Sequence, residues 1–180
     1  MTQWFLDACS LINLYASGRL GEIAEQQGQP FLLVPKVIEE ANWIYVREGN
    51  ERGSRVPIEL DSLIARGALA VTPLTRNIQL QFIRLAVELD DGEAMTIAAA
   101  SEHNVVVITD DEAALKYLGQ KTGLQTSTSL TLLRQHLSEA PVEACLDVIL
   151  NLRICARYIP GPRHPETTWW QSYIQQERDP

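Results

Sequence analysis

Carboxylate side chains stand where apolar segments of this sequence end or where predicted helices begin. Five of them share this placement: Asp7, Glu40, Glu93, Asp110 and Asp111. Carboxylates gathered in one cleft raise one another's pKa, and a hard divalent cation is the usual way in which that repulsion is relieved. Mg²⁺ and Mn²⁺ prefer oxygen ligands of this kind. The set therefore predicts a divalent-metal site.

Each member of the set also has an ordinary structural interpretation. Glu93 and Asp111 could only cap helix N-termini, where carboxylates complement the helix dipole. Glu39 and Glu40 could be solvated surface. Asp7 is harder to explain in this way, because an aspartate at the end of an apolar strand is costly to bury without a partner. It is the whole set that favours a functional site.

The segments that must position these carboxylates alternate between strands and helices up to about residue 138. Strands are predicted at 4–6, 31–34, 68–71 and 105–108, with an edge strand at 123–126. The alternation predicts a three-layer α/β/α fold around a central, mainly parallel sheet of four to five strands, followed by a C-terminal helical extension. Ligands of such sheets bind outside the carboxyl ends of the strands. Asp7 and the pair Asp110-Asp111 fall at those ends.

The chain is predicted to divide into a catalytic domain, residues 1–138, and the extension, residues 139–180. Within the domain, a helix is predicted from Pro35 through Tyr45, and the stretch 49–57 is predicted to be a loop. The extension contains Trp169 and Trp170, which we interpret as anchors that pack the tail onto the domain or onto a second subunit.

Composition narrows the function classes. The chain has 180 residues, enough for one domain, and its formal net charge of −8 makes it as a whole repel nucleic acid. Either its partners are not polyanions or some carboxylates hold cations. No apolar stretch has the length of a membrane helix, and the N-terminus does not resemble a signal peptide. The three cysteines have no CxxC pairing, so a cytoplasmic protein without disulfides or zinc is expected.

Four segments, in order, resemble the motifs of PIN domains, metal-dependent ribonucleases common as toxins of bacterial toxin–antitoxin pairs (the VapC-like type). They are LDACSLI (6–12), PKVIEEA (35–41), DDGEAMTIAAA (90–100) and VVVITDDEAALKYLG (105–119). The resemblance runs from about residue 3 to about residue 130 and leaves the segment after residue 140 unassigned. It implies that Asp7, Glu40, Glu93 and Asp111 are catalytic, with Asp110 beside them, and that they bind Mg²⁺ or Mn²⁺.

A mechanism follows from these ligands. Asp7, Glu93 and Asp111 would hold the cation directly or through water, and Glu40 would orient or deprotonate the attacking water. The sequence thus predicts an endoribonuclease that hydrolyses RNA phosphodiester bonds, with a cognate antitoxin and a homodimer as expected assemblies.

The sequence leaves two other functions open and argues against three more. A non-catalytic interaction protein of the same fold and a housekeeping RNA-processing nuclease both stay open. Cys9 stands where the family often has Ser or Asn, which leaves an orienting hydrogen bond undecided. A haloacid-dehalogenase-type phosphatase would need an aspartate at position 9. A response-regulator receiver would carry its acidic pair near the first strand. The sequence has no glycine-rich phosphate loop, which argues against a nucleotide cofactor.

Two basic groups could contact RNA or could simply be solvated. Arg47, Arg52 and Arg55 cluster around the stretch 49–57. The second group lies beside Tyr158 and the tryptophans, and it consists of Arg153, Arg157, Arg163 and His164. Aromatic rings beside arginines can stack bases, but for the tryptophans we favour packing.

Overall fold

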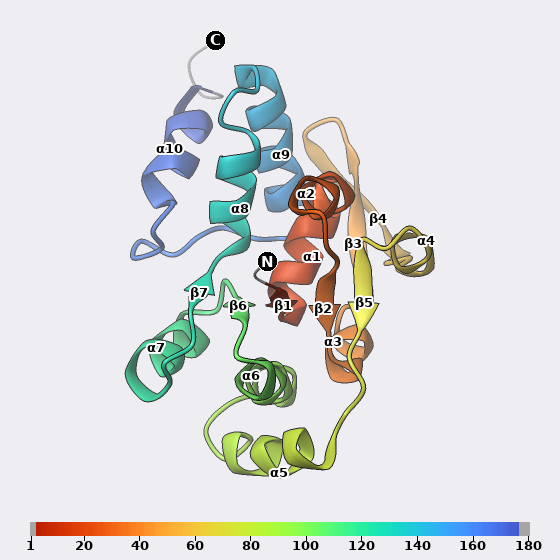
Figure 1. The fold of residues 1–180 in the computed structure, drawn as a ribbon. Helices are drawn as coiled ribbons and strands as arrows, with labels where there is room; N and C mark the ends of the chain where they lie inside the picture. Colours follow the sequence, from red (N-terminus) through yellow and green to blue (C-terminus); the bar gives the residue numbers. More distant parts are fainter. Residues whose placement is uncertain (1–2, 177–180) are drawn as a thin grey trace.

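A five-stranded parallel sheet forms the centre of the molecule (Figure 1). The structure is a computed structural model that describes residues 3–176. The strand order is β5-β2-β1-β6-β7, and every pairing is parallel. The strands are β1 (Trp4–Leu6), β2 (Phe31–Leu33), β5 (Leu69–Val71), β6 (Val106–Ile108) and β7 (Thr126–Ser127). The predicted α/β fold with its parallel sheet is therefore confirmed.

Helices cover both faces of this sheet. Figure 1 shows α1, α2 and α8 on one face with α9 and α10 beyond them, and α3, α6 and α7 on the other face with α5 outermost. The helices are α1 (Ala8–Ala16), α2 (Leu20–Gln27), α3 (Pro35–Glu40), α4 (Asp61–Ala65), α5 (Arg76–Leu85), α6 (Asp91–His103), α7 (Glu112–Lys121), α8 (Ser129–His136), α9 (Val142–Ile154) and α10 (Thr167–Gln176).

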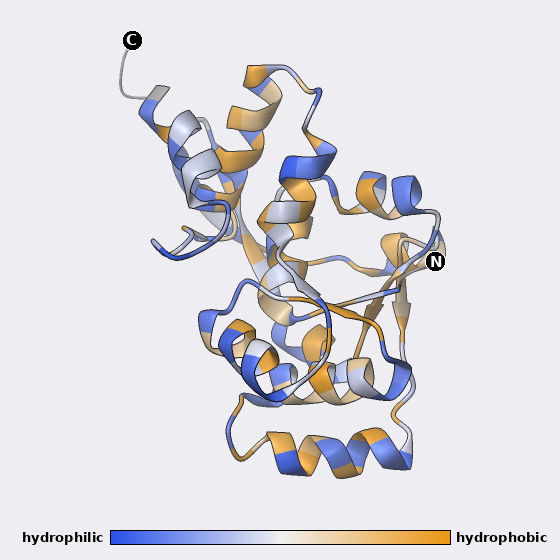
Figure 2. Cartoon of the chain, turned by 60° about the vertical axis from the view of Figure 1, so that its left-hand side comes forward, coloured by the Kyte–Doolittle hydropathy of each residue, from blue (hydrophilic) through white to orange (hydrophobic). Residues whose placement is uncertain are grey.

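The core lies between the sheet and the inner helices, where Figure 2 shows hydrophobic residues gathered around the strands. Helix α6 packs against β1 and β6. Its residues Ala98, Ala99 and Ala100 are fully buried, and these small side chains let the helix lie close to the sheet. Gly18 separates α1 from α2 with a φ of 72°, a left-handed conformation that glycine adopts without strain.

The segment after Glu40 differs from the prediction. Helix α3 ends at Glu40, and an antiparallel hairpin follows, formed by β3 (Trp43–Glu48) and β4 (Glu51–Pro57). The helix predicted through Tyr45 and the loop predicted at 49–57 are both wrong. The aromatic and β-branched run 43–46 favours a strand. Gly49, with a φ of 66°, opens the two-residue turn that reverses the chain.

The C-terminal segment forms α9 and α10, which pack against each other. Trp170 is only 4% exposed and belongs to the main core. Its ring meets the Tyr158 ring edge-on, with 6.2 Å between the centroids. The packing interpretation is therefore confirmed for Trp170, while Trp169 is half-buried against Tyr173. Within residues 3–176, no helix is both long enough and apolar enough to span a bilayer.

Candidate active site

The parallel pairing of β1 and β6 brings two acidic segments together at the carboxyl edge of the sheet. Leu6 pairs with Ile108, and the backbone N–H of Asp7 donates to the carbonyl of Ile108 at 3.2 Å. Asp7 then caps α1, because its Oδ1 accepts from the Ser10 backbone N–H at 2.7 Å. Asp111 lies at the same sheet edge and caps the next helix, α7. The strand register thus places Asp7 beside the acidic turn after β6.

Burial and mutual repulsion shape the ionisation of this group. Asp7 is 3% exposed, and burial raises its pKa to about 7, with a further contribution from the charge of Asp110. A hydrogen bond from Thr109 acts in the opposite direction. Burial also raises the pKa of Glu93 to about 7, and the charges of Asp111 and Asp7 add to the effect. Glu93 therefore lies within electrostatic reach of both Asp7 and Asp111.

The Glu40 side chain approaches Gly92 at the N-terminus of α6, and Gly92 immediately precedes Glu93. Burial raises the pKa of Glu40, a nearby Lys36 opposes this, and Asp91 adds repulsion. The Glu40 carboxylate hydrogen-bonds to the backbone of Gly92. A Cβ atom at position 92 would lie 2.0 Å from the Glu40 Oε2, so only glycine leaves room for this contact. The helix end thus connects Glu40 to the trio formed by Asp7, Glu93 and Asp111.

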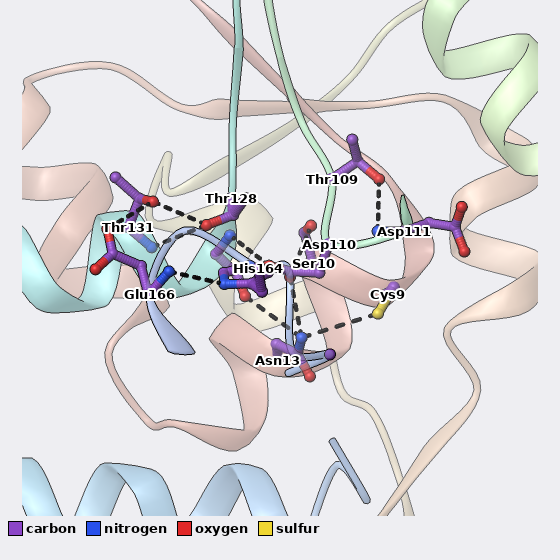
Figure 3. A network of polar contacts seen from close by, with 12 residues as sticks. Cys9, Ser10, Asn13, Thr109, Asp110, Asp111, Thr128, Thr131, His164 and Glu166 are labelled. Carbon is purple, nitrogen blue, oxygen red and sulfur yellow. Dashed lines mark hydrogen bonds and ion pairs between the residues drawn. The ribbon is translucent and has the colours of Figure 1, made fainter. Parts of the chain in front are cut away.

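Asp110 faces the interior and accepts hydrogen bonds on both carboxylate oxygens (Figure 3). It is 7% exposed. Ser10 Oγ donates to Oδ2 at 3.2 Å, and Asn13 Nδ2 donates to the same oxygen at 3.0 Å. The backbone N–H of Ser129 donates to Oδ1 at 3.0 Å. Asp110 therefore ties α1 to the start of α8 beneath the group of carboxylates.

The C-terminal segment reaches the buried surroundings of Asp110 through His164. We call these buried polar residues the floor of the site: Ser10, Asn13, Asp110, Ser129 and His164. His164 is 6% exposed, and its Nδ1 accepts from the backbone N–H of Glu166 at 3.1 Å. The proton must then sit on Nε2, which lies 3.5 Å from Asp110 Oδ1 and has no closer polar partner in the described part of the chain. Glu166 in turn accepts from Arg134 at 2.8 Å.

The second predicted basic group is therefore divided by the fold. His164 is buried at Asp110, and Arg163 pairs with Glu112 at 2.7 Å. Arg157 is exposed on the side of the β3–β4 hairpin, where its charge acts on Tyr45.

Sequence reasoning missed Asn13 and Ser129 of the floor, and it assigned His164 to a basic group and not to the surroundings of Asp110. One signal was available: Asp7, Ser10 and Asn13 recur every third residue on an otherwise apolar helix, which places them on one face. No sequence signal connects His164 to Asp110, because the contact depends on the path of the tail.

Carboxylate oxygens are the ligands that a hard cation prefers, but these side chains do not surround a common point. Within residues 3–176, no three His, Cys, Asp or Glu side chains are arranged closely enough to hold a metal ion. The trio offers carboxylate oxygens, and a cation would offset the burial and repulsion that raise the pKa values of Asp7 and Glu93.

Cys9 lies among these carboxylates. Burial and the charges of Asp7 and its acidic neighbours raise the pKa of the Cys9 thiol well above its usual range. A hard cation such as Mg²⁺ prefers the oxygens of the carboxylates to a sulfur ligand.

A separate cavity of the described structure lies elsewhere. Its volume is about 880 Å³, and residues of α2 and α4 such as Gly21 and Ser62 line it. It contains none of the five carboxylates. The candidate site is therefore an acidic group at the sheet edge and not this cavity.

Comparison with family models gave one match. The model of the DUF3368 family, described as a PIN domain, matches residues 3–163. The matched region includes β1 and α9, so it continues beyond residue 138 into the segment that sequence analysis left unassigned. Comparisons with curated proteins and with solved structures gave no significant match.

Proposed function

Because this chain belongs to the PIN-domain family, a family of nucleases, we propose that it is a metal-dependent endoribonuclease that hydrolyses RNA phosphodiester bonds. The observation that carries the proposal is the group formed by Asp7, Glu93 and Asp111 at the carboxyl edge of β1 and β6. Burial and repulsion raise the pKa of Asp7 and of Glu93 to about 7. A bound cation would lower both pKa values, because it stabilises the charged carboxylates.

Each carboxylate has a distinct proposed role. Asp7, Glu93 and Asp111 would hold Mg²⁺ or Mn²⁺, directly or through water. The ion would act as a Lewis acid on the phosphoryl oxygens and lower the pKa of bound water. Glu40, fixed against the N-terminus of α6, would orient or deprotonate the attacking water.

Asp110 is assigned a positioning role in this scheme, since both of its oxygens already accept hydrogen bonds within the protein. Those bonds hold α1 and α8 in place, and α1 begins at Asp7. Asp110 thus fixes the helix that Asp7 caps.

The test combines cleavage with metal binding. End-labelled structured and unstructured RNAs should be cut with Mg²⁺ or Mn²⁺, and EDTA should abolish the cutting. Calorimetric titration with Mn²⁺ should show binding to the wild-type chain and not to Asp7→Asn. Equal binding by both proteins would contradict the metal site. A wild-type protein stripped of partners that cuts no RNA with either metal would favour the non-catalytic interaction protein.

We also propose that the nuclease is the toxin of a toxin–antitoxin pair, as the family resemblance implies. Induced expression of the wild-type chain should then arrest growth, and Asp7→Asn should not. Co-expression of a small protein encoded directly upstream should relieve the arrest. Normal growth at high levels of active enzyme would instead support a housekeeping RNA-processing nuclease.

A homodimer is the assembly we propose, and α5 offers an apolar stripe that supports it. Leu80 and Ile83 of α5 are 50% and 64% exposed, Val87 just beyond the end of the helix is 83% exposed, and α5 is the outermost helix in Figure 2. Light scattering should give twice the monomer mass for the wild type and the monomer mass for Ile83→Asp. A monomeric wild type would contradict the proposal.

A further inference from the structure

The β3–β4 hairpin carries arginine side chains stacked on aromatic rings. The guanidinium carbon of Arg55 lies 3.6 Å from the centroid of the Trp43 ring and 5.6 Å from that of Tyr45. The guanidinium of Arg52 lies 4.8 Å from the Tyr45 centroid. With Arg157, whose charge acts on Tyr45 from the end of α9, these residues form what we call the arginine–aromatic face.

The hairpin is held firmly against α9. The backbone N–H of Tyr45 donates to the carbonyl of Cys155 at 3.0 Å, and Arg52 Nε donates to the carbonyl of Ile154 at 3.4 Å. Arg47 binds both the backbone and the side chain of Asp147. A ligand that binds this face would therefore meet side chains that are already ordered, which lowers the entropic cost of binding.

The arginines of the face keep their charges unpaired in an acidic protein. Arg52, Arg55 and Arg157 are exposed, and none of them makes an ion pair with a residue of the described chain. By contrast, several other basic residues are paired, Arg47 of the same hairpin among them: Arg19, Arg47, Arg134 and Arg163. The face therefore offers positive charge to an anionic partner, although Glu48 and Glu51 flank the turn of the hairpin.

Arg157 occupies a backbone position that normally suits glycine. Its φ is 59°, in the left-handed region, three residues after the last residue of α9. A side chain is strained in this conformation, and such strain tends to occur where a residue has a functional role. Here the strained residue adds a third arginine to the face.

The face borders the proposed active site. Trp43 follows Glu40 by three residues, and Arg157 immediately precedes Tyr158. Tyr158 lies within electrostatic reach of Asp110 and Asp7, whose charges, together with burial, raise its pKa. A strand of RNA bound on the face could continue from there into the group of carboxylates.

We propose that the arginine–aromatic face binds single-stranded RNA next to the cleavage site, with phosphates paired to arginines and bases stacked on the ring-backed guanidinium planes. This inference rests on the proposed ribonuclease function and names the surface that holds its substrate. Single strands favour such a surface, because their unstacked bases can lie on arginine and aromatic planes. An acidic protein partner would use the charges but would have no need of the stacked planes.

Binding is measured separately from cleavage. The fluorescence anisotropy of a labelled unstructured oligoribonucleotide is followed in EDTA, for the wild type and for Arg52→Ala/Arg55→Ala. The matched control is Arg66→Ala/Arg76→Ala, which removes the same charge from exposed sites. Arg66 precedes β5, and Arg76 follows Thr75, which binds Glu102 near the end of α6. Both control residues therefore lie toward the amino edge of the sheet, opposite the carboxylates.

The hairpin variant should bind RNA ~10- to 100-fold more weakly, in line with the loss of a stacked base, and the control variant should bind like the wild type. The slope of log affinity against log salt should become shallower by ~0.7 for each lost phosphate contact. Arg55→Lys removes the stacked plane and leaves the charge. This variant should keep the slope and still lose affinity. It also leaves the Arg52 bond to α9 intact, which guards against loss of the fold.

The outcomes separate this inference from the proposed function. Cleavage by the wild type with unchanged RNA affinity in the hairpin variant would overturn the inference alone. Hairpin-dependent RNA binding without cleavage at any metal concentration would overturn the nuclease and support the surface. Poly-L-glutamate that displaces the RNA at equal residue concentration would overturn RNA recognition in favour of an acidic protein partner.

Discussion

Asp110 and Asp111 are adjacent in the sequence and lie in opposite surroundings. Asp110 points into the interior, where Ser10, Asn13 and the backbone of Ser129 donate to its two oxygens. Asp111 lies toward the surface, caps α7 and repels Glu93. The same type of side chain thus holds the interior together at position 110 and has a proposed catalytic role at position 111. Both residues follow the same strand, but donors of the described chain reach both oxygens of Asp110, whereas the helix N–H groups of Ala113 and Ala114 reach Oδ1 of Asp111.

The largest expected effect on stability comes from the floor. Asp110→Ala leaves donors from Ser10, Asn13 and Ser129 without their shared acceptor, and breaking a buried polar network of this kind costs about 3–5 kcal/mol. Thermal unfolding should shift down by roughly 6–20 °C, at about 2–4 °C per kcal/mol for a chain of this length. Asp111→Asn is the matched control, since asparagine caps helices as well as aspartate. It should melt like the wild type while RNA cleavage is lost. Equal melting temperatures for both variants would contradict the division between floor and site.

His164 extends the floor to the C-terminal segment, with a smaller expected effect. Its ring is buried and faces Asp110 at 3.5 Å, a distance too long for a strong hydrogen bond. His164→Ala should therefore lower the free energy of unfolding by about 1–3 kcal/mol, mainly through lost packing and lost polar contact. Guanidinium titration measures this change. His136→Ala is the comparison: its half-buried ring bonds to Gln26 and Glu22, which are not part of the floor, and the effect should be smaller. A wild-type unfolding curve for His164→Ala would show that the tail is not fastened at this point.

The parts of this arrangement that the sequence predicted are those set by local pattern and parallel topology. Apolar runs located the strands, and adjacent parallel strands required Asp7 and the turn after Ile108 to share one edge. The sequence did not predict the β3–β4 hairpin, because Ile44 and Tyr45 also fit the apolar spacing of a helix. The contacts of the floor were not predictable from local pattern, because they join residues far apart in the chain. Asn13 contacts Asp110, and His164 reaches the same carboxylate from the C-terminal segment. Only tertiary packing determines such pairings.

Gly92 offers a way to disturb the site without touching a proposed ligand. A methyl group at this position would occupy the space of the Glu40 Oε2, 2.0 Å away, and the flexible Glu40 side chain would have to swing aside. Gly92→Ala should leave stability unchanged or raise it by up to about 1 kcal/mol, because alanine favours helices. Cleavage should fall by ~10-fold or more if Glu40 orients water, as is typical when a supporting contact is lost. Single-turnover cleavage together with thermal melting gives both values. Full activity would show that Glu40 has no role that depends on its contact with α6.

Cys9 gives the smallest expected effect and the finest test of the same division. Its thiol lies between the site and the floor: Asn13 Nδ2 approaches the sulfur at 3.8 Å, and the carboxylates of both regions raise its pKa. If position 9 helps to orient the site through a hydrogen bond, Cys9→Ser should keep or raise the rate of cleavage, because a hydroxyl is the stronger donor. Cys9→Ala, which lacks the donor, is the comparison, and both variants should melt close to the wild type. A strong loss of cleavage in a folded Cys9→Ser protein would show that the sulfur itself acts at the site. Equal rates for the serine and alanine variants would place Cys9 with the floor, where its contribution is packing.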